Sequence, residues 1–103
     1  MADVTIHMME DGRVVDTEKA VCVWQERTEW DGSNLISVNT GSQWEHETVY
    51  LSRKGNYYIK YSSDWQGALD NFAWLSPERA AKWLLLNGHE IPEDLKEHLP
   101  EVE

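Results

Sequence analysis

His46 is the one histidine in this chain with a carboxylate on each side, Glu45 and Glu47. Histidine and carboxylate side chains are the groups that general acid–base catalysis uses most. In an extended strand, however, successive side chains point to opposite faces, so His46 would face away from both glutamates. A small enzyme that uses His46 with Glu45 or Glu47 is therefore the third of three hypotheses, and no catalytic residue is assigned.

Metal ligands and reactive thiols are poorly represented. Asp94 and His98 are four residues apart, so on a helix they would share one face, but a third ligand would have to come from elsewhere. Cys22 is the single cysteine, which excludes an internal disulfide and a zinc site made of several thiolates. Because valines flank Cys22, we expect it to behave as a small hydrophobic residue. We predict no metal site and no cofactor.

Basic and aromatic side chains interleave over residues 53–61, a mixture typical of proteins that bind single-stranded nucleic acid. In such proteins the cations follow the phosphates and the rings stack on bases. The residues concerned are Arg53, Lys54, Tyr57, Tyr58, Lys60 and Tyr61. The same pattern fits an ordinary hairpin, because tyrosine favours strands and basic side chains are common on exposed edges. Single-strand binding is therefore the second hypothesis.

Carboxylates dominate the charge of the chain. Its 103 residues include 19 acidic and 9 basic side chains, for a net charge of −10. Duplex DNA and anionic membranes would repel such a surface, and no segment is apolar enough for a membrane helix. The partner that this charge favours is a basic protein. The leading hypothesis is a non-catalytic interaction protein, and one concrete form is an inhibitor that mimics the charge of nucleic acid.

Two features are candidates for the surface that meets such a partner. The acidic C-terminal region supplies Glu93, Asp94 and Glu97. Trp65 lies among polar residues in a loop, and exposed tryptophans are frequent interface anchors. The alternative for Trp65 is that it folds back over the edge of the sheet. The sequence does not indicate an oligomeric state.

Strand patterns come first in the chain and helix patterns last. Alternating or β-prone residues predict strands at 3–9, from 13, 20–29, 35–38, 47–52, 57–62 and 71–75. Ser76, Pro77 and Glu78 together predict the start of a helix that ends at Gly88, and a second short helix starts near Pro92.

These elements predict one α+β domain over residues 1–103, with an antiparallel sheet of about five strands and two C-terminal helices packed on one face. A small β-barrel with C-terminal helices is the alternative. The six tryptophans are spread along the chain, which favours a single aromatic core. A lone cysteine and the lack of a signal-like segment at the start favour the cytoplasm.

Overall fold

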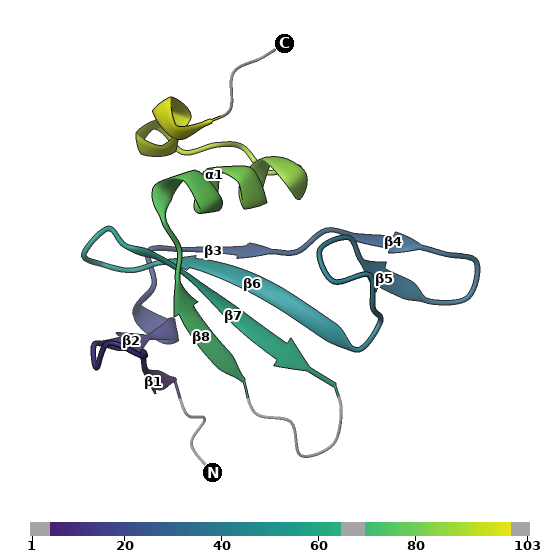
Figure 1. The fold of residues 1–103 in the computed structure, drawn as a ribbon, viewed down its shortest axis with the longest axis horizontal. Helices are drawn as coiled ribbons and strands as arrows, with labels where there is room; N and C mark the ends of the chain where they lie inside the picture. The colour runs from purple at the N-terminus through teal and green to yellow at the C-terminus, as the bar shows by residue number, and fades with distance from the viewer. Residues whose placement is uncertain (1–4, 65–69, 100–103) are drawn as a thin grey trace.

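A four-stranded antiparallel sheet forms the centre of the fold (Figure 1). In the computed structural model, which describes residues 5–64 and 70–99, the strand order is β3-β6-β7-β8. These strands are β3 (Cys22–Gln25), β6 (Glu45–Leu51), β7 (Tyr57–Ser63) and β8 (Asn71–Trp74). Two separate hairpins accompany the sheet: β1 (Ile6–Met8) with β2 (Val14–Asp16), and β4 (Thr28–Trp30) with β5 (Leu35–Ser37). A short 3-10 helix, η1 (Thr17–Lys19), follows β2.

The α+β class with antiparallel sheets is confirmed, but the strands form three sheets rather than one. The predicted strand 20–29 is interrupted between β3 and β4, because Glu26 and Arg27 leave the ladder. The Arg27 backbone N–H donates to Asn87 Oδ1 at 2.7 Å, and the Glu26 carboxylate turns toward His46. The barrel alternative is wrong for the part of the chain described, since β3 and β8 remain the edges of an open sheet.

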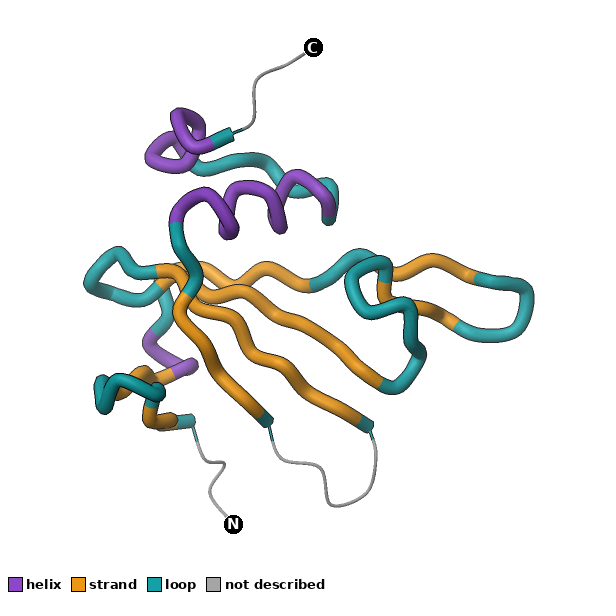
Figure 2. Tube along the Cα trace, in the orientation of Figure 1, coloured by secondary structure: helices purple, strands orange, loops and turns teal. Residues whose placement is uncertain are grey.

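Helix α1 (Pro77–Leu86) and the 3-10 helix η2 (Glu93–His98) form a layer over one face of the sheet (Figure 2). The predicted start of α1 is confirmed: Ser76 Oγ accepts from the Arg79 N–H at 3.3 Å, and Pro77 is the first helical residue. Gly88 follows the helix with φ +76°, a conformation that glycine adopts readily. The second predicted helix is only a six-residue 3-10 segment. None of the helices within residues 5–64 and 70–99 could cross a membrane.

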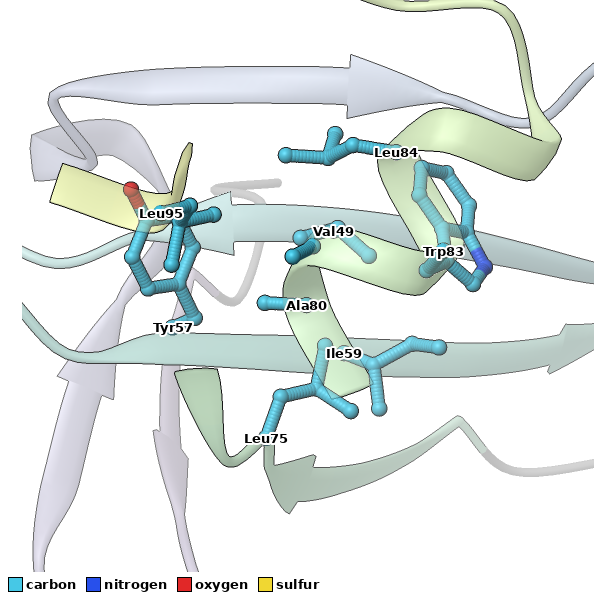
Figure 3. Packing of buried hydrophobic residues seen from close by; sticks show 9 residues of the cluster. Val49, Tyr57, Ile59, Leu75, Ala80, Trp83, Leu84 and Leu95 are labelled. Carbon is cyan, nitrogen blue, oxygen red and sulfur yellow. The ribbon is translucent and has the colours of Figure 1, made fainter. Parts of the chain in front are cut away.

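The main core lies between this helical layer and the sheet (Figure 3). Val49 and Ile59 are cross-strand partners at the centre of the sheet, and both are buried against α1. Ala80 faces them, and its small side chain allows the helix to approach the sheet closely. Leu84 and Leu95 complete the cluster from α1 and η2. Both leucines are almost fully buried, so each contributes about 1.5–3 kcal/mol of hydrophobic stabilisation.

A second, smaller core covers the opposite face of the sheet. Met9 and Val15 from the β1–β2 hairpin region pack there against Tyr50 and Tyr58. The two tyrosine rings are stacked, with their centroids 5.0 Å apart. Both faces of the central sheet are therefore apolar at the middle of β6 and β7, which explains why neither strand reads as a simple apolar–polar alternation.

The tryptophans do not form the single core that their distribution favoured. Trp83 is buried, and Trp24 and Trp74 are partly buried on opposite faces of the sheet. Trp30 and Trp44 are 65% and 42% exposed. The physical reason is that Trp30 belongs to a hairpin of two three-residue strands, which is too small to bury its own side chains. Trp65 lies outside the described residues.

Candidate functional site

Charge is divided between the two ends of the β6–β7 hairpin. Its turn carries Arg53 and Lys54, both exposed. At the opposite end, Glu45 begins β6 and pairs with Ser63, which Asp64 follows directly. Asp70 precedes Asn71, whose partner in β7 is Tyr61, so it lies at that same end. We refer to the exposed carboxylates Glu45, Asp64 and Asp70 as the acidic end of the sheet.

The β4–β5 hairpin projects beyond the sheet on the side of the acidic end (Figure 1). Trp30 and Leu35 are cross-strand partners on it, and their side chains are 65% and 58% exposed. Glu29 and Asp31 flank Trp30 in the sequence and are exposed as well. Backbone N–H donors at Asn34 and Ser33 lower the pKa of Asp31, so this carboxylate stays charged to lower pH. Glu29 also forms an ion pair with Arg27 at 3.0 Å, which offsets part of its charge, so Asp31 is the more strongly negative of the two carboxylates beside the apolar pair.

The base of this hairpin is attached to the end of α1 by Asn87, which is buried. Its Oδ1 accepts from the Arg27 backbone N–H at 2.7 Å and from Asn39 Nδ2 at 2.9 Å. Its Nδ2 donates to Asn39 Oδ1 at 3.0 Å and to the Trp83 carbonyl oxygen at 2.7 Å. Because Arg27 precedes β4 and Asn39 follows β5, one side chain fixes both ends of the hairpin.

His46 pairs with neither of its neighbours in the sequence. Its Nδ1 lies 2.8 Å from Glu26 Oε1 and its Nε2 lies 2.9 Å from Asp64 Oδ2. Glu47, on the other face, accepts from Trp83 Nε1 at 2.9 Å. Partial burial of His46 opposes its charged form, but the hydrogen bonds with Asp64 and Glu26 outweigh this and raise its pKa. With both ring nitrogens occupied, the histidine connects β6 to two flanking segments, an arrangement that leaves neither nitrogen free for a substrate.

The predicted acidic residues of η2 lie on the helical layer, away from the acidic end. The Glu93 and Glu97 side chains are 89% and 80% exposed. Asp94 accepts a hydrogen bond from the Tyr57 hydroxyl at 3.2 Å, which ties η2 to β7. His98 lies 3.4 Å from Glu78 rather than beside Asp94. No three His, Cys, Asp or Glu side chains in the described part of the chain are grouped to hold a metal ion.

The basic and aromatic residues of 53–61 do not form one surface. Tyr57 and Tyr58 are 4% and 0% exposed, and they lie in the cores on opposite faces of the sheet. Lys60 and Tyr61 are half-buried and also face opposite ways, since neighbouring strand residues alternate. The expectation that the rings of Tyr57 and Tyr58 are available to stack on bases is therefore wrong.

Sequence reasoning missed the exposed pair Trp30 and Leu35. The predicted strands 20–29 and 35–38 were not expected to pair with each other across residues 31–34. A four-residue segment that contains glycine, between two β-prone residues, also predicts a hairpin loop. That signal would have placed Trp30 and Leu35 opposite each other.

Comparison with known proteins identifies no relative of this chain. The chain matches no protein family, and no curated protein or solved structure is significantly similar to it. The function is therefore argued from the side chains and their surroundings.

Proposed function

We propose that this protein is a non-catalytic interaction protein that binds a basic protein partner. Trp30 and Leu35 would enter the partner, and Glu29, Asp31 and the acidic end would surround the contact. The observation that carries the proposal is the exposure of Trp30 and Leu35 on a projecting hairpin among carboxylates. The exposed free thiol of Cys22 supports a reducing compartment, and we propose the cytoplasm.

Energetic considerations support this arrangement. Interfaces depend on a few buried anchors, and tryptophan is among the residues most enriched at such positions. Burial of an aromatic side chain on binding removes apolar surface worth about 25 cal/mol per Å² from water. The surrounding carboxylates add little affinity of their own, but they raise the rate of encounter with a positively charged partner and exclude acidic ones.

A more specific form of the proposal is an inhibitor whose carboxylates stand in for phosphates. The exposed Glu93 and Glu97 of η2 support a second negatively charged surface on the helical layer. Asp94 is less suited to this role because the Tyr57 hydroxyl already occupies it. Trp65, the other predicted anchor, stays a prediction because it falls outside the described residues.

The hairpin contact is tested by capture from native cell extract. Wild-type protein is immobilised beside a Trp30→Ala, Leu35→Ala double variant. The control is Leu85→Ala with Leu86→Ala, since these two leucines are 55% and 58% exposed on α1. We expect the wild type and the control to retain the same basic protein, and the hairpin variant to lose it. Equal retention by all three proteins would contradict the role of the hairpin.

Charge reversal distinguishes the two acidic surfaces once a partner is in hand. Glu93→Lys with Glu97→Lys changes η2, whereas Glu29→Lys with Asp31→Lys changes the hairpin. If the hairpin alone binds, only the second pair weakens the complex and reduces its dependence on salt. If the carboxylates of η2 imitate phosphates, the first pair has the larger effect. Asp94 is left unchanged in both, because its replacement would also disturb Tyr57.

A further inference from the structure

The face of the sheet opposite the helical layer contains a cavity of about 370 Å³. It lies between the β1–β2 hairpin and the turn that connects β6 to β7. Val15 and Trp74 supply apolar wall, and Arg53 and Lys54 line the side formed by the turn. Small-molecule sites in proteins have volumes of about 300–1,000 Å³, so this cavity falls at the lower end of that range.

Positive charge is concentrated around this cavity. Four of the nine basic residues of the chain line it, namely Arg13, Lys19, Arg53 and Lys54. Asp16 is the one carboxylate in the lining, and Asp11 pairs with Arg13 at 2.6 Å from outside it. Four cations therefore face two carboxylates, in a chain where acids outnumber bases by 19 to 9.

Three of these cations have no carboxylate partner within residues 5–64 and 70–99. Arg13 is held by Asp11, whereas no acidic oxygen there is within 4.0 Å of a basic nitrogen of Lys19, Arg53 or Lys54. These side chains come from two separate segments, η1 and the β6–β7 turn, which the fold brings to one cavity. Unpaired cations beside an apolar wall favour the binding of an anion.

The aromatic wall contains a polar atom that lacks a partner. Tyr58 is fully buried, and its hydroxyl makes no hydrogen bond within the described part of the chain. Burial raises the pKa of Tyr58 to about 12, so the hydroxyl keeps its proton and can donate at neutral pH. Beside it, the Arg13 guanidinium lies 4.2 Å from the centroid of the Trp74 ring. A buried donor without a partner is costly, but this hydroxyl has no accessible surface, so it destabilises the free protein and does not contact a ligand in the cavity.

We propose that this cavity binds a small organic anion, in which a flat aromatic or heterocyclic ring carries a phosphate or carboxylate group. Lys19, Arg53 and Lys54 hold the anionic group. The ring of the ligand lies against the apolar wall of Val15 and Trp74. The site lies at the opposite end of the β6–β7 hairpin from the acidic end, so it does not depend on the proposed protein interface.

The binding test compares four ligands that carry an aromatic ring, an anionic group or both, so that the contribution of each to affinity can be measured. Adenosine monophosphate and indole-3-acetate carry a ring with a phosphate and a carboxylate, respectively. Adenosine supplies a ring alone, and inorganic phosphate supplies charge alone. Calorimetry measures affinity, and the indole N–H resonance of Trp74 in ¹⁵N-labelled protein reports the location.

We expect at least one charged aromatic probe to bind about tenfold or more tightly than adenosine and phosphate, because charge and ring contribute together. Which of the two probes binds distinguishes a phosphate from a carboxylate ligand. The proposal is overturned if neither probe shifts the Trp74 resonance at a probe concentration of about 1 mM, because even a weak site with a Kd in that range would be partly occupied. Equal binding of inorganic phosphate alone also overturns it.

Variants locate the site. Arg53→Glu with Lys54→Glu should abolish binding, whereas Lys82→Glu with Lys96→Glu makes the same change of charge on the helical layer and should leave it intact. Equal loss in both pairs would show that only net charge matters and would reject the cavity as the site. Tyr58→Phe should raise the melting temperature of the free protein and leave binding unchanged, because the hydroxyl has no surface in contact with the cavity.

Discussion

Replacement of Asn87 by alanine tests how the β4–β5 hairpin is held. The substitution removes four hydrogen bonds and leaves the Arg27 N–H and the Trp83 carbonyl without these partners. A net value of about 0.5–1.5 kcal/mol per hydrogen bond gives an expected loss of about 2–6 kcal/mol in the free energy of unfolding. This is a large share of the 5–15 kcal/mol that is typical of a folded domain.

Asn39→Ala is the matched control. It removes only the two hydrogen bonds between the amides of Asn39 and Asn87, and Asn87 still bonds to Arg27 and Trp83. The expected loss is about 1–3 kcal/mol. Urea unfolding followed by tryptophan fluorescence measures both values, and a double-mutant cycle gives their coupling.

Hydrogen exchange then shows where the structure loosens. In Asn87→Ala, the amide of Arg27 and those of β4 and β5 should exchange faster, while the amides of β6 and β7 keep most of their protection relative to global unfolding. The reasoning is refuted if Asn87→Ala costs no more than Asn39→Ala, or if exchange in β4 and β5 is unchanged. In either case something other than Asn87 would position the hairpin.

Three further predictions concern the buried side of α1, the N-cap of α1 and the hydrogen bonds of His46. Leu84→Ala should lower the free energy of unfolding by about 3–5 kcal/mol in urea titrations, because Leu84 is fully buried and its loss leaves a cavity. The control is Leu85→Ala, on the exposed side of α1, which should lower it by less than about 1 kcal/mol. Ser76→Ala should cost about 1 kcal/mol in the same assay through loss of the N-cap, and Ser76→Asp should restore it. The pKa of folded His46 lies above the ordinary value of 6.5. The contribution of protonated His46 to the free energy of unfolding is therefore complete at pH values below its ordinary pKa and is lost as the pH rises through the pKa of the folded state. Stability measured against pH should fall over that window in the wild type and not in His46→Gln, and an NMR titration of His46 that gives a pKa at or below 6.5 would contradict the two hydrogen bonds.

Elements with local signals could be predicted from the sequence. The β6–β7 hairpin follows from two β-prone segments around a turn with Gly55, whose φ is +88°. The start of α1 follows from Ser76 and Pro77, whose effects act within one turn of helix. The excess of acidic residues follows from composition alone, although the separation of carboxylates and basic side chains to opposite ends of the β6–β7 hairpin does not.

Features that depend on distant residues could not be predicted. The break between β3 and β4 is fixed by a hydrogen bond between Arg27 and Asn87, which are 60 residues apart. His46 is paired with Glu26 and Asp64, 20 and 18 residues away, rather than with its neighbours. The basic cavity likewise combines separate segments: Arg53 and Lys54 stand out in the sequence, but nothing there places Arg13 and Lys19 beside them.

The open sheet has a consequence for how copies of this protein behave in solution. Within residues 5–64 and 70–99, the outer sides of β3 and β8 pair with no further strand, and both Val23 in β3 and Val21 just before it are exposed. Such an edge can template cross-molecular pairing, which leads to aggregation. At neutral pH the net charge of −10 opposes this approach. Near the isoelectric point of about 4.7 that repulsion disappears, so colloidal stability should be lowest in mildly acidic buffer and should depend on the edge valines.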